Sequence, residues 1–293
     1  MKKLSPEEER IIAHKGTEKP FSGEYWDSFR AGIYFCKRCG APLYWSKDKF
    51  KSDCGWPSFD EEINGAVKRK KDADGMRTEI MCSRCGAHLG HVFTGEKLTS
   101  KNTRHCVNSI SMEFVPEEKM NVQTMVLGGG CFWCVESAFL LVDGVIEVTS
   151  GYAGGKTKNP AYNEVCSGKT GHAEVVKLAY DAKKVSLEKL LKIFFKIHDP
   201  TSPNKQGNDV GNQYRSAIFY TEDSQKKEIE EFVKNAQKEY EKPIVTEVRK
   251  LGEFYKAEEY HQRYFEKNPL HPYCLLAIPP KIRKVKEILG KEK

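Results

Sequence analysis

The sequence predicts two domains, an all-β domain followed by a mixed α/β (α+β) domain. A chain of 293 residues is longer than one typical compact domain. Short strand-like runs separated by Gly, Asp and Asn fill the first half, which is typical of an all-β domain. Strand-like and helical runs alternate in the second half, which indicates an α/β or α+β domain. We therefore expect domains at 1–115 and 124–293.

The segment between these domains, residues 116–123, is predicted to be a linker. The run VPEEKMNVQ, which ends at Gln123, is polar, contains a proline and lacks periodicity.

The whole chain is 39% hydrophobic and 30% charged, with a net charge of +7. Its lysines are scattered among acids, which argues against nucleic-acid binding.

No apolar run approaches the roughly 20 residues that a bilayer crossing needs, so we expect no membrane span. The N-terminal run MKKLSPEEER has no apolar core and is not expected to be a signal peptide. We therefore expect a cytoplasmic protein, in which ten cysteines indicate metal binding or catalysis rather than structural disulfides.

The first half is expected to open with a helix at Pro6, because Ser5 can cap it and Glu8 completes a capping box. Three strand-like runs follow, GIYFC (32–36), RTEIMC (77–82) and SISMEFV (109–115). In the second half we expect a strand at 124–129, a helix from Phe132, and a strand at 172–181. A helix at 186–199, a strand at 216–221 and an amphipathic helix at 222–242 complete the pattern.

Two CxxCG turns in the first half form the clearest metal-site signal. They are CKRCG, starting at Cys36, and CSRCG, starting at Cys82. Paired turns of this kind can present four thiolates to one tetrahedral zinc. The alternatives are two independent redox dithiols or buried free cysteines, but a repeated signal favours zinc. The predicted ligands are Cys36, Cys39, Cys82 and Cys85.

Other reactive groups of the first half lie outside these turns. Cys106 follows Arg104, whose cationic side chain would favour a nucleophilic thiolate. Cys54 stands near Trp56. His88 and His91 have the spacing of a zinc pair, but four cysteines already satisfy a zinc. We therefore expect the two histidines to be acid groups or substrate contacts.

The run GGGCFWCVE places Cys131 at a strand-to-helix junction, where the helix N-terminus lowers the pKa of a thiol. From the residues alone, Cys131 and Cys134 are a metal pair, a dithiol, or one reactive thiol with a spectator. Phe132 and Trp133 either pack in the core or contact a small apolar group of a substrate.

Further along the second half, Glu174 lies in a strand-like run. It is either a buried, protonated acid or a residue on a solvent-facing side of the strand. The loop QGNDVGNQYRS carries Asp209 and Tyr214 and is predicted to be a binding loop rather than a plain connector.

The runs YWSKDKFKSDCGWPSF, CSRCGAHLGHVF and NTRHCVNSISM, in this order, resemble methionine sulfoxide reductase B. The resemblance implies that Cys106 is the nucleophile and Cys54 the resolving thiol. It also implies a sulfoxide pocket lined by Trp56, His88, His91, Arg104 and Asn108. After GHVF many family members carry an acid, whereas this chain has Thr94, Gly95 and Glu96, so Glu96 is left without a role.

The runs GCFWC, SGYAGG, YNEVCSGKTGHAEV, QGNDVGNQYRS and EYHQRYFEKNP resemble methionine sulfoxide reductase A. This resemblance implies Cys131 as the nucleophile and Glu174 as the acid acting on the sulfoxide oxygen. The residues implied to bind the substrate are Phe132, Trp133, Tyr162, Asp209 and Tyr214. Cys274, in NPLHPYC, occupies the place where many relatives carry a resolving thiol, and we favour it over Cys134.

Together the resemblances imply a bifunctional enzyme that reduces methionine sulfoxide, in proteins or free, with thioredoxin as reductant. The first domain is expected to take the R epimer and the second the S epimer, because the two epimers need separate enzymes. Zinc is expected to be purely structural, with no organic cofactor. The implied folds are barrel-like sheets in the first domain and a ferredoxin-like sandwich in the second.

Two rival functions make different predictions. A thioredoxin-like disulfide exchanger would need Cys134 as much as Cys131, but the chain lacks the expected Trp-Cys-Gly-Pro-Cys type of run. A nucleic-acid-binding zinc ribbon would show a basic stripe with interleaved aromatics, which the sequence lacks.

Overall fold

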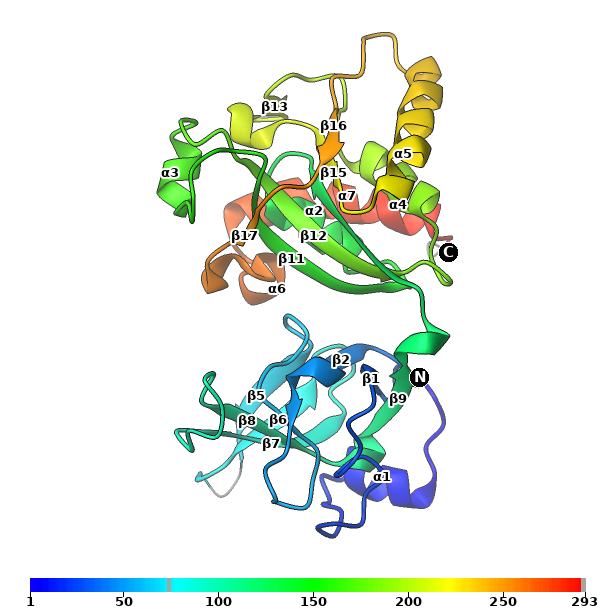
Figure 1. The fold of residues 1–293 in the computed structure, drawn as a ribbon, viewed down its shortest axis with the longest axis vertical. Coiled ribbons are helices and arrows are strands. Elements are labelled where there is room, and N and C mark those ends of the chain that lie inside the picture. The colour runs from blue at the N-terminus through cyan, green and yellow to red at the C-terminus, as the bar shows by residue number, and fades with distance from the viewer. Residues whose placement is uncertain (73–74, 291–293) are drawn as a thin grey trace. The chain divides into compact units, whose positions relative to one another are not determined.

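A computed structural model describes residues 1–72 and 75–290 and divides the chain into two compact units, Met1–Met120 and Asn121–Lys293 (Figure 1). The division falls inside the predicted linker, residues 116–123. That segment contains the 3-10 turn η3 (Glu117–Lys119), and its last two residues already belong to a strand, β10 (Val122–Gly128). The prediction of two domains is confirmed.

The first unit is built from antiparallel sheets. One sheet has the order β2-β1-β9 and another the order β3-β4-β8-β7-β6-β5. The strands of the first sheet are β1 (Gly32–Cys36), β2 (Pro42–Trp45) and β9 (Met112–Pro116). Those of the second are β3 (Lys49–Phe50), β4 (Ser58–Phe59), β5 (Val67–Lys71), β6 (Thr78–Cys82), β7 (His88–Thr94) and β8 (Thr103–Val107). Tyr34, Tyr44 and Phe59 are fully buried, and the Tyr44 and Phe59 rings stack at 4.3 Å. Closure of the two sheets into a barrel-like arrangement stays a prediction.

The predicted strand at 109–115 begins later than expected. Ser109–Ser111 form the 3-10 turn η2, and the strand β9 starts at Met112. The reason lies in the Glu18 carboxylate, which accepts the backbone N–H groups of Ser109 and Ile110. These amides are thereby withdrawn from strand pairing.

The helix predicted at Pro6 is confirmed as α1 (Pro6–Ile12). The Ser5 hydroxyl accepts from the Glu8 N–H at 3.3 Å, and the Glu8 carboxylate accepts from the Ser5 N–H at 2.7 Å. Ile11 and Ile12 bury one side of the helix against the unit. The remaining short element of this unit is the 3-10 turn η1 (Ser46–Asp48).

The second unit contains a sheet of order β16-β15-β10-β12-β11-β17, in which only the β15–β16 pairing among the described strands is parallel. Besides β10, its strands are β11 (Val145–Ala153), β12 (Ala173–Asp181), β15 (Ala217–Tyr220), β16 (Glu247–Lys250) and β17 (Phe254–Lys256). A short hairpin pairs β13 (Lys205–Gln206) with β14 (Asp209–Val210). The α+β prediction for this unit agrees with that mixture of strands and helices, and the ferredoxin-like class stays a prediction.

Successive side chains along a strand of this sheet point to opposite faces, and the two faces belong to different hydrophobic core clusters. Met125, Leu178 and Ile218 belong to the main core, which includes residues of α2 (Phe132–Phe139), α4 (Leu187–Ile197) and α7 (Pro272–Ile288). These helices lie on one side of the sheet (Figure 1). Val126, Val175 and Phe219 point to the other side and form a smaller cluster.

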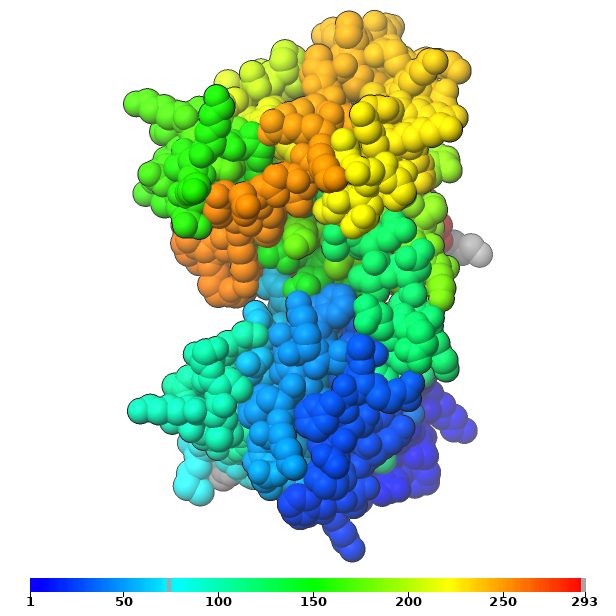
Figure 2. Space-filling model, in the orientation of Figure 1, coloured from blue at the N-terminus to red at the C-terminus, as the bar shows by residue number. Residues whose placement is uncertain are grey.

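Other helical elements surround this core. The predicted helix at 222–242 is α5 (Asp223–Ala236) followed by the 3-10 turn η5 (Gln237–Glu239), and it lies on the surface of the unit (yellow in Figure 2). The helix predicted at 186–199 is α4, capped by Ser186 as expected. The rest are α3 (Tyr162–Cys166), η4 (Asn212–Tyr214), η6 (Glu259–His261) and α6 (Tyr264–Lys267).

The helix α7 was not predicted, because its sequence contains Pro279 and Pro280. A proline inside a helix lacks the N–H group and clashes with the preceding turn, at a cost of about 3 kcal/mol. Cys274, Ile278 and Val285 are each fully buried, and this burial stabilises the helix in spite of the prolines.

Over residues 1–72 and 75–290, the helices lack the combination of length and apolarity that a bilayer crossing requires.

Candidate functional site

The two CxxCG turns have the same backbone construction. Each follows the last residue of a strand, Cys36 of β1 or Cys82 of β6. Gly40 N–H donates to the Cys36 carbonyl at 2.8 Å, and Gly86 N–H donates to the Cys82 carbonyl at 2.9 Å. Both glycines have a φ near 70°, which an L side chain rarely adopts.

The turns bring the four predicted zinc ligands together. Their Sγ atoms lie within 4.8 Å of one another. The distance is 3.7 Å for Cys36 to Cys85 and 3.7 Å for Cys39 to Cys82. Zinc–sulfur bonds of about 2.3 Å in a tetrahedron place the sulfurs about 3.8 Å apart. The four thiols therefore fit one tetrahedral zinc.

Cys54 and Cys106 also meet, away from those turns. Their Sγ atoms are 3.8 Å apart, and Cys106 lies on β8 directly opposite Ser58 of β4. The Ser52 hydroxyl donates to the Cys54 Sγ at 3.1 Å. The predicted nucleophile and its predicted resolving thiol are thus neighbours.

The pKa values of these two thiols are shifted in opposite directions. The hydrogen bond from Cys106 lowers the pKa of Cys54 to about 4. The same contact, together with burial, raises the pKa of Cys106. Arg104 acts on the pKa of Cys106 in the predicted downward direction, but Cys54 and burial outweigh it.

Glu96, which had no assigned role, engages Arg104. The Arg104 Nε donates to Glu96 Oε2 at 2.7 Å and its NH2 group donates to Oε1 at 2.8 Å. The guanidinium also lies 4.5 Å from the centre of the Phe93 ring. The bidentate pair fixes a cation two residues before Cys106 on the same strand.

Trp56 and Asn108 both contact the chain around Glu18. The Trp56 indole N–H donates to the Glu18 carbonyl at 3.2 Å. Asn108 accepts from the Glu18 N–H at 3.0 Å and donates to the Leu89 carbonyl at 3.1 Å. Asn108 is 2% exposed, and its two hydrogen bonds connect the backbone at Glu18 with the backbone at Leu89, beside Cys106.

The two predicted histidines lie on β7 with their ring centres 5.7 Å apart. His91 is the cross-strand partner of Cys106, and its Nε2 lies 3.0 Å from Asp72 Oδ2. His88 is buried, with Nδ1 2.8 Å from Glu79 Oε1. Sequence reasoning missed Glu79, although a Glu inside the strand-like run RTEIMC is the signal that singled out Glu174.

In the second unit, Cys131 is the N-cap residue of α2 and is 7% exposed. The glycines before it are required by packing: a Cβ on Gly129 would lie 2.7 Å from the Phe194 ring. Burial and the contact with Cys134 raise the pKa of Cys131, so the expected lowering by the helix N-terminus is outweighed. The hydrogen bond from Cys131 lowers the pKa of Cys134 to about 7.

Glu174 is the buried acid of the two alternatives. Its side chain is 2% exposed, and its Oε2 accepts from the Phe132 N–H at 3.1 Å. Burial raises the pKa of Glu174 to about 8 against the opposing effect of that N–H. A carboxyl with this pKa holds a proton at neutral pH.

The aromatic pair after Cys131 packs in two ways. Phe132 is 1% exposed, with its ring centre 5.0 Å from His261. Trp133 is partly exposed and stacks on Tyr264 at 3.7 Å, while its N–H donates to His261 Nδ1 at 3.2 Å. Trp133 therefore remains available to a ligand, whereas Phe132 is mostly core.

The remaining predicted residues of this unit lie around Cys134 and Glu174. Asp209 accepts from the Tyr273 hydroxyl at 2.7 Å, and that hydroxyl lies 3.8 Å from Cys134 Sγ. Burial and the neighbouring Glu174 raise the pKa values of Tyr162 and Tyr214. Tyr273 was missed, although it directly precedes Cys274.

Cys274 is the third residue of α7 and is fully buried. Burial raises the pKa of Cys274, and the charge of Cys134 adds to this effect. Cys274 and Cys134 belong to the same buried core cluster.

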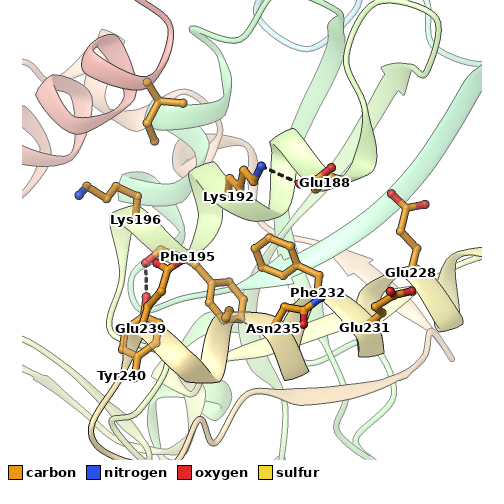
Figure 3. Close-up of a pocket in the computed structure, with 12 residues that line it drawn as sticks. Glu188, Lys192, Phe195, Lys196, Glu228, Glu231, Phe232, Asn235, Glu239 and Tyr240 are labelled. Atoms are coloured by element: carbon orange, nitrogen blue, oxygen red, sulfur yellow. Dashed lines mark hydrogen bonds and ion pairs between the residues drawn. The ribbon is translucent and has the colours of Figure 1, made fainter.

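A groove of about 690 Å³ lies between α4 and α5, and none of the thiols described above lines it. Its walls include Phe195, Phe232 and Ile288 as well as the ion pair of Lys192 with Glu188 (Figure 3). It contains none of the candidate residues.

Comparison with known families covers nearly all of the chain. The SelR domain family matches residues 4–116, and the peptide methionine sulfoxide reductase family matches residues 123–293. The chain is 59% identical over 168 residues to peptide methionine sulfoxide reductase MsrA of Trichodesmium erythraeum, covering 57% of this chain and 95% of that protein. It is 50% identical over 163 residues to MsrA of Sulfolobus acidocaldarius, covering 56% and 93%.

Two solved structures resemble the second unit. One is Mxr1 from Saccharomyces cerevisiae in reduced form, with a TM-score of 0.50 and 37% identity over 52% of this chain and 89% of that one. The other is methionine sulfoxide reductase A of Corynebacterium diphtheriae, with a TM-score of 0.50 and 38% identity over 51% and 76%. The chain therefore belongs to the peptide methionine sulfoxide reductase family, as a fusion of an N-terminal SelR (B-type) domain with a C-terminal A-type domain.

Proposed function

We propose that each domain reduces one epimer of methionine sulfoxide, the N-terminal domain the R epimer and the C-terminal domain the S epimer. The observation that carries the proposal is that each unit holds its own pair of neighbouring thiols, Cys54 with Cys106 and Cys131 with Cys134. A reductase of this kind needs one thiol to attack the sulfoxide and a second to convert the resulting sulfenic acid into a disulfide.

In the C-terminal domain, the Cys131 thiol is hydrogen-bonded to the Cys134 thiolate, which takes up the Cys131 proton as Cys131 attacks. The Cys131 thiolate attacks the sulfoxide sulfur while Glu174 gives its proton to the oxygen. The oxygen then transfers to the Cys131 sulfur while the bond between the two sulfurs and the substrate S–O bond break, so that methionine leaves as the sulfide and Cys131 becomes a sulfenic acid. Tyr162, Asp209 and Tyr214 bind the substrate, and Trp133 contacts its methyl group.

Two thiols of this domain then take part in resolution. The Cys134 thiol condenses with the Cys131 sulfenic acid, which forms a disulfide and releases water. The Cys274 thiolate next attacks Cys134, so that a Cys134–Cys274 disulfide forms and Cys131 is regenerated. The contact of Cys134 with Cys131 and its charge effect on Cys274 support this order over the direct reaction of Cys274 with Cys131 that we expected from the sequence.

A thiol count in single turnover tests the order of resolution. With excess sulfoxide and no reductant, we expect Cys274→Ser to lose two thiols from this domain and Cys134→Ser to accumulate the sulfenic acid on Cys131. A Cys134→Ser protein that forms the disulfide as fast as wild type would contradict the order.

In the N-terminal domain, Cys106 is the nucleophile and Cys54 the resolving thiol. Their Sγ atoms are 3.8 Å apart, so the Cys106 proton can pass to Cys54 as Cys106 attacks. When Cys54 later condenses with the Cys106 sulfenic acid, that proton leaves as part of the released water. Arg104, held by Glu96, stabilises the Cys106 thiolate. His88 and His91 supply the acid for the sulfoxide oxygen, and Trp56 borders the substrate.

Zinc in this domain is proposed to be structural. The four cysteines provide all four positions of a tetrahedral site, so no position is open to a substrate. When bound, the metal supplies a cross-link between the turn after β1 and the turn after β6. No step of the reaction passes through it.

The disulfides of both domains require an external dithiol, and we propose thioredoxin for this role. A dithiol protein reduces a disulfide by two successive exchanges, which returns both cysteines to thiols. The expected observation is steady turnover of both epimers with thioredoxin, its reductase and NADPH. Turnover with a monothiol alone and none with thioredoxin would contradict this choice.

Trapping of the sulfenic acids tests the assignment of the epimers. Cys54→Ser and Cys134→Ser variants are each treated with one epimer and dimedone, and the modified cysteine is mapped by mass spectrometry. We expect dimedone on Cys106 with the R epimer and on Cys131 with the S epimer. The reverse pattern, or label on both cysteines with one epimer, would refute the assignment.

A further inference from the structure

Glu79 is a buried carboxylate at the edge of the Cys106 site. It lies on β6 and is 1% exposed. Its Oε1 is 2.8 Å from His88 Nδ1, and its Oε2 accepts from Lys15 Nζ at 2.7 Å. Burial opposes ionisation, but Lys15 and His88 outweigh it and hold the pKa of Glu79 below its ordinary value. The side chain is therefore an ionised acceptor inside the fold.

This carboxylate determines which nitrogen of His88 carries the proton. An ionised carboxylate only accepts hydrogen bonds, so Nδ1 of His88 must be the protonated nitrogen in the neutral ring. Nε2 is buried and has no hydrogen-bond partner among the described residues. A buried ring nitrogen without a partner is unusual in a protein interior and calls for an explanation, of which a catalytic role is one.

The strand register links this histidine to the reacting thiol. Glu79 of β6 is opposite His91 of β7, and His91 is opposite Cys106 of β8. Since directly opposite residues share one face of a sheet, Glu79, His91 and Cys106 form a row across three strands. The His88 ring contacts His91 edge to face at 5.7 Å, which places it beside that row.

We propose that Glu79 is a positioning residue for the N-terminal domain's reaction, which fixes His88 with Nδ1 protonated and Nε2 facing the sulfoxide oxygen, and that Lys15 modulates it. The proposal rests on the function proposed above for Cys106. In the protonated ring, Nε2–H gives its proton to the oxygen as Cys106 attacks the sulfur. His88 returns to the neutral form and keeps its Nδ1–H bond to Glu79.

Charged and titratable groups from four parts of the chain face this assembly. Glu79 comes from β6, His91 from β7 itself and Lys15 from the segment after α1. Asp72, before β6, binds His91 and also attracts Lys15. Burial lowers the pKa of His88, Glu79 opposes this lowering, and His91 and Lys15 add to it.

The signs of these effects provide the test. R-epimer reduction requires protonated His88, so activity falls as the pH rises through its pKa. Glu79→Gln preserves the shape and an acceptor for Nδ1–H but removes the negative charge. The descending limb of the pH–activity profile for the R epimer should therefore move to lower pH by about one unit. Lys15→Met removes a positive charge, so the limb should move up. A structural role for either residue would not shift the limb in opposite directions.

Glu62→Gln is the matched control. Glu62 binds Arg69 and lies 3.3 Å from Nε2 of the buried His105, which is paired with Val92 rather than with His91. Removing this carboxylate should leave the limb in place. S-epimer turnover by the same chain reports the concentration of active protein in every variant.

A second measurement does not depend on the variants being folded. Nitrogen-15 spectra of the His88 ring in the wild-type chain should show the proton on Nδ1 when the ring is neutral. A neutral ring protonated on Nε2, or variants whose limbs move in the same direction or not at all, would overturn the proposal. Failure of the underlying function is distinct: the wild-type chain would then not reduce the R epimer, or Cys106→Ser would retain that activity.

Discussion

At the scale of single residues, the buried carboxyl of Glu174 controls the chemistry of the C-terminal domain. It is 2% exposed, and burial raises its pKa to about 8. An acid of this pKa donates a proton below pH 8 and is ionised above it. S-epimer reduction should therefore decrease as the pH rises through about 8.

Glu174→Gln tests this role because it keeps the acceptor for the Phe132 N–H and loses the proton. We expect kcat for the S epimer to decrease by about 100-fold or more, since general acids contribute on this scale. R-epimer turnover by the same protein is the internal control. A variant that retained more than a tenth of the S-epimer kcat would show that another group protonates the oxygen.

The same pKa predicts how stability depends on pH. The folded domain holds the Glu174 proton up to about pH 8, whereas the unfolded chain releases it near the ordinary value of 4.5. Stability from this group is thus lost as the pH rises from about 4.5 to 8. Urea unfolding across this range should show a decrease for wild type that is smaller in Glu174→Gln. Equal slopes would contradict the raised pKa.

The sequence identified most groups that carry chemistry but not the groups that hold them. Cys106, Cys131 and Glu174 stand in local runs that single them out. Lys15 with Glu79, and Asp209 with Tyr273, are hydrogen-bonded pairs whose members are 64 positions apart. Such partners depend on the tertiary fold, so no local pattern predicts them.

At the scale of elements, the pairing of β7 with β8 aligns His91 with Cys106. Gly90 has a φ of 152°, and a Cβ added there would lie 2.0 Å from the Cys106 carbonyl oxygen. The backbone of the two strands must therefore separate if any side chain is introduced. The glycine is a requirement of the register that builds the site.

Gly90→Ala should lower the stability of the N-terminal domain and reduce R-epimer kcat/KM at least tenfold. Gly95→Ala is the matched control, since φ is 89° but no atom lies within 4 Å of the added Cβ. Its cost is the backbone strain of about 1 kcal/mol. Equal losses of stability and activity in the two variants would show that the close approach to Cys106 is unimportant.

The elements that sequence predicted well are those with a local signal. The capping box of α1 and the cap of α4 by Ser186 are examples. The helix α7 and the turn η2 depend on distant residues: burial of α7 overrides two prolines, and Glu18 diverts the amides of η2 from a strand.

At the scale of the whole molecule, the two units contain separate thiol pairs, and the tetra-cysteine site belongs to the first unit alone. Removal of zinc with a strong chelator under denaturant should abolish R-epimer reduction after refolding and spare S-epimer reduction. One zinc per chain by elemental analysis, and its loss in Cys82→Ser, would accompany this result. Loss of both activities on chelation would contradict independent units.

The division of labour between Cys106 and Cys131 is the central claim, and steady-state assays on epimer-resolved methionine sulfoxide test it most directly. Cys106→Ser should lose reduction of the R epimer and keep that of the S epimer. Cys131→Ser should show the opposite pattern. Retention of both activities by either variant, or loss of both, would contradict the assignment of one epimer to each domain.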